Sequence, residues 1–482
     1  MTKLEQNAIK LVKILNKAGF TAFFAGGYVR DKILKRKTSD IDIATNATPN
    51  QIKKVLDKNK VKHIEIGEQF GVIAAIIDKV SFEIATFRED QGIDDSRHPK
   101  KVKLNVKPEE DAQRRDFTIN GMFLENKNEK IKMKNCGVAS RHINNKVNFN
   151  FGTVIDYVGG VQDIKSRIIR FIGDPDERIH EDALRMIRGI RFSAQLGFEI
   201  EKESFEAIIK NKKLIGKVSA ERIKEELNKI LTSPNPRKGI ELLDKTGIFN
   251  LIIPEFEKTK TTPQPPNMHL EGSVWNHTLL SLEKMRKNSD PVLTWAVLLH
   301  DLAKAYTITT PEEHGEDRIR FSGHDSEGAK MAEVVMKRLK FSNDEIEKVS
   351  WLIKYHMLFS NLFKMRGARR IKYLKHPHFA DLLELFWVDA NSSIRSNKYG
   401  NPLPAHLGAY DKAKRFFETE SKRKPLPKAI INGFDVMRLL GVKSGNKMVG
   451  KIMNELYDMQ LEKKFKTKKE GLKLAEKLLK RK

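Results

Sequence analysis

The chain contains one cysteine, Cys136, among 482 residues, so no internal disulfide can form. It also lacks an apolar run long enough to span a membrane and any stretch with the pattern of a signal peptide. These absences favour a cytoplasmic protein with no membrane contact. Acidic residues are comparatively few, with Asp+Glu 63 against Lys+Arg 90, which leaves a formal net charge of +27 and a pI near 9.7. Such a chain attracts polyanions in a salt-dependent way, although charge alone gives no specificity.

The length predicts about three domains of roughly 150 residues each. Strand and helix patterns alternate at first, with β-prone stretches at 73–77 and 82–87, and the later patterns are helical. We therefore expect an α+β N-terminal part with a mixed sheet, followed by an all-α remainder. Changes of composition divide the chain at 1–160, 161–260, 267–400 and 401–482, with a linker rich in Thr and Pro at 261–266 and a lysine-rich helix at the end.

A double glycine and a pair of carboxylates carry the first chemical signal. Residues 21–25 predict a strand that ends at Gly26-Gly27, and residues 29–34 then predict a helix whose first amides can face phosphate oxygens. In Ser39-Asp40-Ile41-Asp42-Ile43 a period of two places both carboxylates on one strand face and both isoleucines in the core. Neighbouring carboxylates repel unless cations lie between them, and Mg²⁺ suits oxygen ligands, water and phosphates. Alone, each motif is more often an ordinary turn or strand edge; together they indicate metal-assisted chemistry on a nucleotide.

In strand, turn, helix, strand order, GGYVRD and SDIDIAT resemble the signature of the polymerase-β-like nucleotidyltransferases. More narrowly, they are similar to the bacterial-type (class II) tRNA nucleotidyltransferase and poly(A) polymerase family. Three further family motifs follow: RRDFTIN at 114–120, EDxxR within 173–188 and a neck-helix motif at 221–227. The resemblance implies a nucleotidyltransferase head at 1–160 and a helical neck at 161–260 that selects nucleotides and binds RNA. It also implies roles for single residues: Asp40 and Asp42 hold Mg²⁺, with Glu83 as a third carboxylate; Gly26, Gly27 and Arg30 hold the triphosphate; and Arg115 and Asp116 contact the ribose.

The EDxxR segment allows two interpretations. Apolar residues recur at helical spacing over 179–196, while Asp182, Arg185, Arg188 and Arg191 mark another face, and all four are candidates for nucleotide binding. An exposed Asp/Arg pair at i, i+3 contributes only about 0.2 to 0.5 kcal/mol. In a closed pocket, Asp182 would instead accept a hydrogen bond from the exocyclic amine of C or A, and Arg185 would donate to the adjacent ring nitrogen. G and U would leave these groups unpaired, which rejects a wrong substrate by about 10⁴ to 10⁵ fold. The family resemblance favours this protein template.

The third part carries His277, the doublet His300-Asp301 and Asp389, with His324 and His356 in between. The doublet follows the apolar run 295–299 and precedes Lys304, and the set resembles the HD domain, which binds divalent metal and often hydrolyses phosphate esters. Imidazoles with carboxylates suit a transition metal such as Ni²⁺, Mn²⁺ or Co²⁺ better than Mg²⁺. We expect His277, His300, Asp301 and Asp389 to be the ligands. Phosphohydrolase activity and a role as an RNA-binding body both stay open.

The resemblance implies template-independent transfer of CMP and AMP from CTP and ATP to the tRNA 3′ end, forming CCA and releasing pyrophosphate. Its expected partner is tRNA, through the acceptor stem and T arm. A poly(A) polymerase is disfavoured because 67–71 reads GEQFG where that branch has a Gly-Arg-Arg-Phe-like element, and the charged loop at 89–101 argues against CC-only addition. An A-only enzyme, an HD hydrolase with a degenerate head and a structural RNA binder are less favoured by the motifs. We expect residues 126–151 to be a surface insertion, either a hairpin or a disordered loop.

Overall fold

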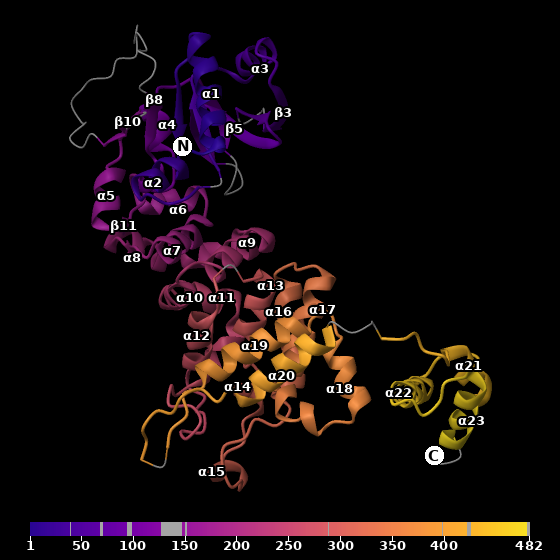
Figure 1. Ribbon diagram of the computed structural model, residues 1–482. Coiled ribbons are helices and arrows are strands. Elements are labelled where there is room, and N and C mark those ends of the chain that lie inside the picture. Colours follow the sequence, from indigo (N-terminus) through magenta and orange to yellow (C-terminus); the bar gives the residue numbers. More distant parts are fainter. Residues whose placement is uncertain are drawn as a thin grey trace. The chain divides into compact units, whose positions relative to one another are not determined.

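The structure, a computed structural model, describes residues 1–38, 40–67, 71–93, 99–126, 147–149, 152–287, 289–397, 399–421 and 426–479. The chain divides into two compact units, Met1–Pro254 and Glu255–Lys482 (Figure 1). Ser39, Cys136, nearly all of the 126–151 insertion and the middle of both the 67–71 and 89–101 segments lie outside the described residues. The predicted α+β head followed by helices is confirmed. No helix of the described part is long and apolar enough to cross a membrane.

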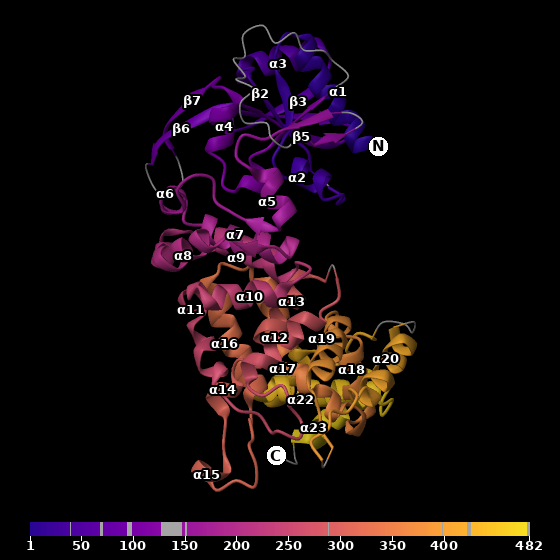
Figure 2. The ribbon, with the colours of Figure 1, turned by 90° about the vertical axis from the view of Figure 1, so that its left-hand side faces the viewer.

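An eight-stranded mixed sheet forms the first half of unit 1, in the order β3-β4-β5-β2-β1-β8-β10-β9. Only the β2–β5 pairing within it is parallel. Helices α1 and α3 pack on the sheet and against each other (Figure 2). The strands are β1 (Ala22–Ala25), β2 (Asp42–Thr45), β3 (Lys62–Gly67), β4 (Val72–Ile77), β5 (Val80–Thr86), β8 (Phe123–Asn126), β9 (Asn148–Phe149) and β10 (Gly152–Ile155), and the helices are α1 (Lys3–Lys17), α2 (Gly27–Ile33), α3 (Pro49–Lys58), α4 (Pro108–Gln113), η2 (Thr118–Asn120) and α5 (Gly160–Ser166).

Aromatic side chains fix the centre of this head. Phe23, Phe87 and Phe123 are buried, and their ring centroids lie 5.8 to 6.1 Å apart, a spacing at which tilted aromatic pairs attract. Strand β6 (Arg88–Ile93) pairs with β7 (Pro99–Leu104) in a separate two-stranded sheet. The predicted charged loop at 89–101 therefore contains paired strand residues on both sides of its tip.

The neck completes unit 1 and contains one departure from prediction. The sequence predicts one helix over 179–196, but α6 ends at Glu181 and α7 begins at Arg185, with Asp182 extended at φ −153° and ψ 103°. Helix α7 packs against α9 and α10. The neck elements are β11 (Ile168–Ile169), α6 (Pro175–Glu181), α7 (Arg185–Leu196), β12 (Glu199–Ile200), α8 (Lys202–Asn211), η3 (Lys212–Lys217), α9 (Ala220–Leu231), α10 (Pro236–Lys245) and α11 (Ile248–Ile252).

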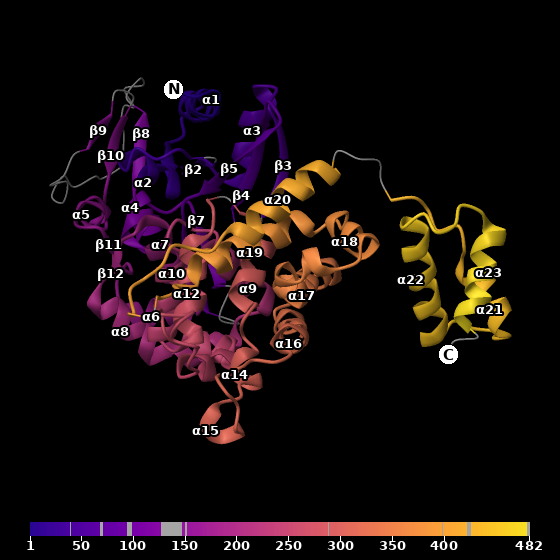
Figure 3. The same ribbon diagram turned by 60° about the horizontal axis from the view of Figure 1, so that its bottom comes forward.

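Unit 2 is helical throughout its described part apart from isolated β-bridges. Trp295 is fully buried at its core, where α12, α13, α17 and α19 pack together. Helices α21, α22 and α23 pack on one another (Figure 3) around Val436, Ile452 and Leu456. The helices are η4 (Pro254–Lys260), α12 (Val274–Lys284), α13 (Pro291–Leu299), α14 (Lys304–Thr307), α15 (Pro311–His314), α16 (His324–Arg338), α17 (Asn343–Tyr355), η5 (His356–Ser360), η6 (Leu362–Lys364), α18 (Gly367–Leu374), α19 (Phe379–Ser392), α20 (Gly408–Ser421), α21 (Gly433–Leu440), α22 (Lys447–Leu461) and α23 (Lys468–Leu479).

The predicted linker at 261–266 is not a free tether. Thr262 and Gln264 are buried, with Gln264 only 3% exposed. The carbonyl oxygen of Thr262 accepts a hydrogen bond from the amide of Val274 at the start of α12, over 3.1 Å. Gln264 Oε1 accepts a hydrogen bond from Lys304 Nζ over 2.9 Å. The segment is thus anchored to unit 2 by two buried side chains, while Thr261, Pro263 and Pro266 are exposed.

Candidate active site

Three carboxylates gather on the head sheet. Asp42 is the first residue of β2, and the parallel pairing of Ile43 with Ile84 places it beside Glu83 on β5. Burial, together with the charges of Asp40 and Glu83, raises the pKa of Asp42 to about 6, and Arg115 opposes the rise. Burial and Asp40 also raise the pKa of Glu83. Mutual repulsion of this kind is what bound divalent cations relieve, so the donor set fits Mg²⁺.

The prediction that Ile41 and Ile43 lie in the core is confirmed, since both are buried. The predicted strand is shorter than expected, because β2 begins at Asp42. Asp40 itself lies two residues before β2 and is exposed. The carboxylate oxygens of Asp40, Asp42 and Glu83 do not all lie within 4.8 Å of one another. The head site is therefore open and loosely assembled.

The double glycine brings the backbone close to this site. Gly26 has φ +65°, and a Cβ there would lie 3.4 Å from both Asp42 Oδ2 and Arg115 Nη1. A Cβ on Gly27 would lie 3.4 Å from Arg30 Nη2. Arg30 is held in place, because its Nη1 donates to Asn120 Oδ1 over 2.8 Å and its Nε pairs with Asp31 over 2.9 Å. The structure thus brings both glycines, Arg30, Arg115 and Asp42 together.

The RRDFTIN motif ties the head to the neck within unit 1. Asp116 accepts hydrogen bonds from Arg188 Nε over 2.9 Å and from the amide of Phe117 over 2.8 Å. Burial alone would raise the pKa of Asp116, but the charge and hydrogen bonds of Arg188 outweigh it and lower the pKa to about 2. Arg115 pairs with Asp111 over 3.0 Å. Both residues predicted to contact the ribose therefore already have ionic partners.

Asp182 and Arg185 are not paired with each other. Asp182 lies in the break between α6 and α7, where its Oδ2 accepts from Arg222 Nη2 over 2.6 Å and its Oδ1 accepts from the amide of Leu184 over 3.1 Å. Arg185 pairs with Glu181 and donates to the carbonyl oxygen of Arg178 over 3.0 Å. The simple i, i+3 ion pair of an exposed helix is absent here, because the helix is interrupted where that pair would form.

Sequence reasoning missed two neck residues that hold these groups. Arg222 on α9 binds Asp182, and Glu226, one turn further along α9, pairs with Arg191 Nε over 2.9 Å. Burial lowers the pKa of Arg191 to about 10, and Glu226 limits the fall. The sequence did contain a signal for Glu226, because its spacing from Ile223 and Leu227 places it on the apolar face of α9. In the structure it is only 3% exposed. A charged residue on an apolar helix face implies a buried partner.

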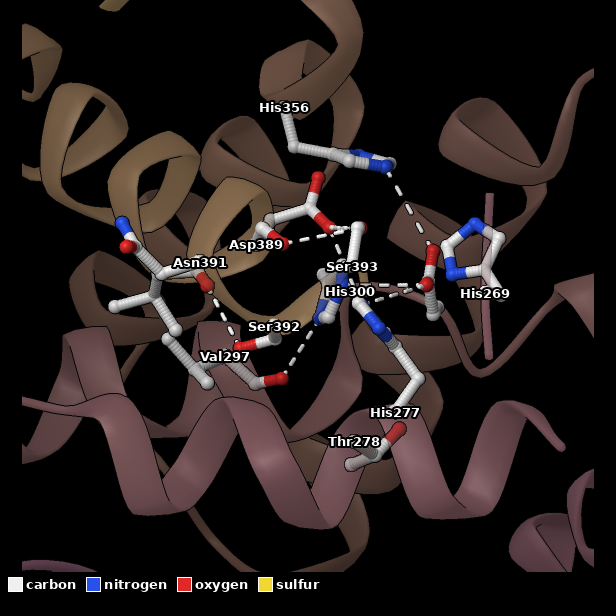
Figure 4. Close-up of polar contacts among 12 residues, drawn as sticks. His269, His277, Thr278, Val297, His300, His356, Asp389, Asn391, Ser392 and Ser393 are labelled. Atoms are coloured by element: carbon white, nitrogen blue, oxygen red, sulfur yellow. Dashed lines mark hydrogen bonds and ion pairs between the residues drawn. The ribbon is translucent and has the colours of Figure 1, made fainter. Parts of the chain in front are cut away.

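The HD residues converge in the interior of unit 2 (Figure 4). His277 Nε2 lies 3.2 Å from Asp389 Oδ1 and 3.6 Å from Asp301 Oδ2, and His300 Nε2 lies 3.3 Å from Asp301 Oδ2. His277 Nδ1 is held by Glu271 over 2.9 Å and His300 Nδ1 by the carbonyl oxygen of Val297 over 2.8 Å. Both Nε2 atoms and both oxygens of Asp301 are buried without a hydrogen bond. Asp301 Oδ2 faces the Nε2 atoms of His277 and His300, and Lys304 Nζ lies 2.7 Å from it. Imidazole nitrogens and carboxylate oxygens gathered in this way fit a metal ion, and the outer contacts orient its ligands.

Comparisons with known proteins agree with this arrangement. Three family models match in order: the poly A polymerase head domain over 22–170, the probable RNA and SrmB-binding site of polymerase A over 197–259, and the HD domain over 274–383. They define a chain with a poly(A)-polymerase-type head joined to an HD domain. A curated CCA-adding enzyme of Pediococcus pentosaceus is 34% identical over 310 residues, which cover 63% of this chain and 71% of that protein. The chain belongs to the family of CCA-adding enzymes.

The match to other curated relatives is partial, since this chain spans 56% to 63% of the length of three CCA-adding enzymes that are 34% to 37% identical. The fold is shared over the whole chain with the Bacillus stearothermophilus CCA-adding enzyme in complex with CTP, at TM-score 0.69 and 22% identity, covering 100% of this chain and 99% of that one. It is also shared with the Thermotoga maritima CCA-adding enzyme complexed with tRNA, at TM-score 0.52 and 19% identity, covering 99% and 96%.

Proposed function

We propose that this protein adds CCA to the 3′ end of tRNA, taking CMP and AMP from CTP and ATP and releasing pyrophosphate. The observation that carries the proposal is the carboxylate set Asp40, Asp42 and Glu83 beside Gly26 and Arg115. Asp40 and Asp42 would hold Mg²⁺, which would supply Lewis-acid stabilisation of the charge that develops on the attacking hydroxyl and the phosphate. Family membership and the relatives' complexes with CTP and tRNA support the choice of substrates.

The chain's own residues would orient and select the nucleotide. Gly26 allows the close approach of a phosphate, and Arg30 supplies positive charge that Asn120 orients. Asp182 has spare acceptor capacity for the exocyclic amine of C or A, because a carboxylate has about four lone-pair sites and two donors reach it here. Arg185 likewise retains N–H donors beyond those used by Glu181 and Arg178. The neck contacts would therefore preorganise the two base-reading groups.

The test of this proposal uses tRNAs that end at the discriminator base, at C or at CC, each supplied with single nucleotides, followed by sequencing of the ends. An enzyme that adds the full CCA gives ends that read CC when the first two substrates are supplied with CTP, and it adds one A to the third substrate when ATP is supplied. A CC-only or A-only enzyme stops at one stage, and a poly(A) polymerase adds repeated A without regard to the end. The same assay with an unstructured RNA oligonucleotide controls for recognition of the acceptor stem and T arm. The cytoplasmic location stays a prediction.

A second candidate activity rests on unit 2, where the buried cluster favours metal-dependent hydrolysis of phosphate esters. His277, His300, Asp301 and Asp389 would hold a transition metal such as Ni²⁺, Mn²⁺ or Co²⁺. Lys304 Nζ, 2.7 Å from Asp301 Oδ2, could attract a phosphate oxygen. Metal analysis of the purified protein, together with hydrolysis of phosphate monoesters and cyclic phosphates after loading, tests this candidate. His300→Ala should lose metal while CCA addition persists, and a metal-free wild-type protein after loading would reduce the unit to a structural body.

A further inference from the structure

Phe192, in the second half of α7, has three arginines close to its ring. The guanidinium carbon of Arg191 lies 4.1 Å from the ring centroid, that of Arg30 lies 5.3 Å from it and that of Arg188 lies 5.9 Å from it. A guanidinium within about 6 Å of an aromatic centroid is attracted to the negative face of the ring. Phe192 is 5% exposed, so water screens this attraction little. The ring therefore joins an arginine of the head helix α2 to two arginines of the neck helix α7.

Three like charges in one place repel one another, so something must hold them together. Burial, together with the charges of Arg188 and Arg30, lowers the pKa of Arg191 to about 10, while Glu226 opposes the fall. Each guanidinium has its own carboxylate partner, and the pairs are Arg30–Asp31, Arg188–Asp116 and Arg191–Glu226. These carboxylates neutralise the cations one at a time. The ring of Phe192 is a contact that all three arginines have in common.

Packing in the interior of unit 1 fixes the ring itself. Phe117 meets Phe192 edge to face, with centroids 5.5 Å apart and an interplanar angle of 78°. Phe117 in turn packs on Phe171 with centroids 4.7 Å apart. Gly189 leaves room for this arrangement, since a Cβ there would lie 3.2 Å from Phe117 Cζ. The ring of Phe192 thus has a fixed position from which it can orient the arginines.

The arginines keep donors for an anionic ligand. Arg30 donates to Asp31 and Asn120, and Arg188 donates to Asp116, which leaves N–H groups of both guanidiniums unused by these partners. The Arg188 side chain is 35% exposed, so the cluster can be reached from solvent. A Cβ on Gly27 would lie 3.4 Å from Arg30 Nη2, so the cluster borders the double-glycine turn. That turn is where the triphosphate of the incoming nucleotide is expected.

We propose that Phe192 is a positioning residue for nucleotide addition, whose ring holds Arg30, Arg188 and Arg191 in the arrangement that binds the triphosphate. This inference rests on the CCA addition proposed above. Phe192 acts through the arginines, which are assembled before the nucleotide arrives, so less freedom is lost when the phosphates bind. CTP and ATP carry the same triphosphate, so the ring serves both nucleotides, whereas Asp182 and Arg185 are the groups proposed to distinguish the bases.

The experiment removes the ring and measures binding of the phosphates separately from selection of the base. Phe192→Met and Phe192→Leu keep an apolar side chain without the ring, and Phe192→Tyr keeps the ring. The matched control is Phe198→Met, because Phe198 is a buried aromatic of the same neck whose ring lies 5.6 Å from a different arginine, Arg167. For each protein, kcat and KM are measured with CTP, ATP and UTP, together with inhibition by inorganic pyrophosphate.

Both variants without the ring should raise KM for CTP and for ATP by about tenfold, with a smaller change in kcat. The inhibition constant of pyrophosphate should rise by a similar factor, because pyrophosphate uses the same arginines. The ratio of kcat/KM for CTP to that for UTP should stay as in the wild type. Phe192→Tyr and Phe198→Met should keep wild-type KM values. Thermal melting of each variant identifies the folded ones, and two variants without the ring ensure that the comparison does not depend on one of them.

The other outcomes contradict the proposal in distinguishable ways. Wild-type KM values and pyrophosphate inhibition in the variants without the ring would overturn the role of Phe192 and leave CCA addition intact. An equal rise of KM in Phe198→Met would show general damage to the neck and also overturn it. A change in the ratio for CTP and UTP would assign the ring to base selection instead. Absence of nucleotide addition in the wild type would overturn the proposed function and this inference together.

Discussion

The head and the HD unit each gather acidic residues for divalent cations, but they do so in opposite ways. The head site is open: Asp40 is exposed, and the proposed ligands are carboxylate oxygens on the sheet and just before strand β2. The HD cluster is closed: His277, His300 and Asp301 are at most 1% exposed, and hydrogen bonds fix the histidine rings. An open oxygen site leaves room for water and substrate phosphates, whereas a closed imidazole site is assembled before any substrate arrives. The head cation is therefore expected to arrive with the nucleotide, and the HD cation to be resident.

The largest expected effect tests the open site. Asp42→Ala or Asp40→Ala should lower the rate of nucleotide addition by about 10³ fold or more, because two-metal assistance supplies several kcal/mol of transition-state stabilisation. Binding of tRNA, measured on filters, should change little, since replacing an aspartate removes no positive charge from a chain of net charge +27. Asp78→Ala, at an exposed carboxylate paired with Lys3, is the matched control. Unchanged turnover in both site variants would remove the metal assignment and with it the contrast between the two sites.

Removing metal from the closed site should act on stability instead of nucleotide addition. A ligand present at about 1,000 times its dissociation constant stabilises the state that binds it by about 4 kcal/mol. Stripping the protein with a chelator should lower its melting temperature, and restoring Mn²⁺ should recover it. The variant His300→Ala should melt low with or without Mn²⁺. Equal melting temperatures for stripped and loaded wild-type protein would show that the cluster is no resident metal site.

Asp182→Ala tests whether the neck selects the base of the incoming nucleotide. The substitution removes a hydrogen-bond acceptor for the exocyclic amines of C and A, so binding of these bases weakens. It also removes a carboxylate that repels U and G, so exclusion of these bases weakens. The ratio of kcat/KM for CTP to that for UTP should fall by about 10² fold on a tRNA that ends at the discriminator base. The control is Asp176→Ala, which breaks a surface pair with Lys210 near the start of α6. A uniform loss for all four nucleotides, with the ratio unchanged, would instead indicate damage to the α6–α7 break.

The smallest expected effect concerns the link between head and neck in unit 1. Because Arg188 lowers the pKa of Asp116 from 3.8 to about 2, this carboxylate stabilises the fold fully above pH 4. The contribution, about 2 kcal/mol, is lost as the pH falls from about 4 to about 2. Asp116→Asn should flatten that part of the curve of unfolding free energy against pH. The control Asp57→Asn, at an exposed residue of α3, should keep the wild-type slope of unfolding free energy against pH. If Asp116→Asn keeps that slope as well, the Asp116–Arg188 pair is not the cause of the pH dependence.

Local periodicity made much of the fold predictable. The strands expected at 21–25, 73–77 and 82–87 are confirmed as β1, β4 and β5, because short apolar runs bounded by turn residues mark them in the sequence. Burial alternates in β5, whereas every residue of β1 is buried. The break at Asp182 was missed because apolar residues on both of its sides, Ile179 and Ala183, are buried, so the helical pattern continues across it.

Contacts distant in sequence could not be predicted in the same way. The partners Asp116 and Arg188 are 72 residues apart, and Asp182 and Arg222 are 40 apart, so no local pattern connects them. The sequence placed His324 and His356 between the expected HD ligands but could not assign them. A lone histidine is more often a core residue, and only the packing of helix ends around Asp301 brings the Nε2 atoms of these two rings to 3.2 Å from each other.

Burial of Gln264 is expected to protect the segment at 261–266 from cleavage by proteases. Its side chain is only 3% exposed and accepts a hydrogen bond from Lys304, which in turn lies beside Asp301 of the HD cluster. A protease must bind several consecutive residues in an extended form, and although Thr261, Pro263 and Pro266 are exposed, binding of the whole segment would pull Gln264 away from Lys304. Susceptibility of this Thr- and Pro-rich segment to cutting therefore reports whether the interior of the HD unit is intact, and a nick at that place would mark molecules in which it has already come apart.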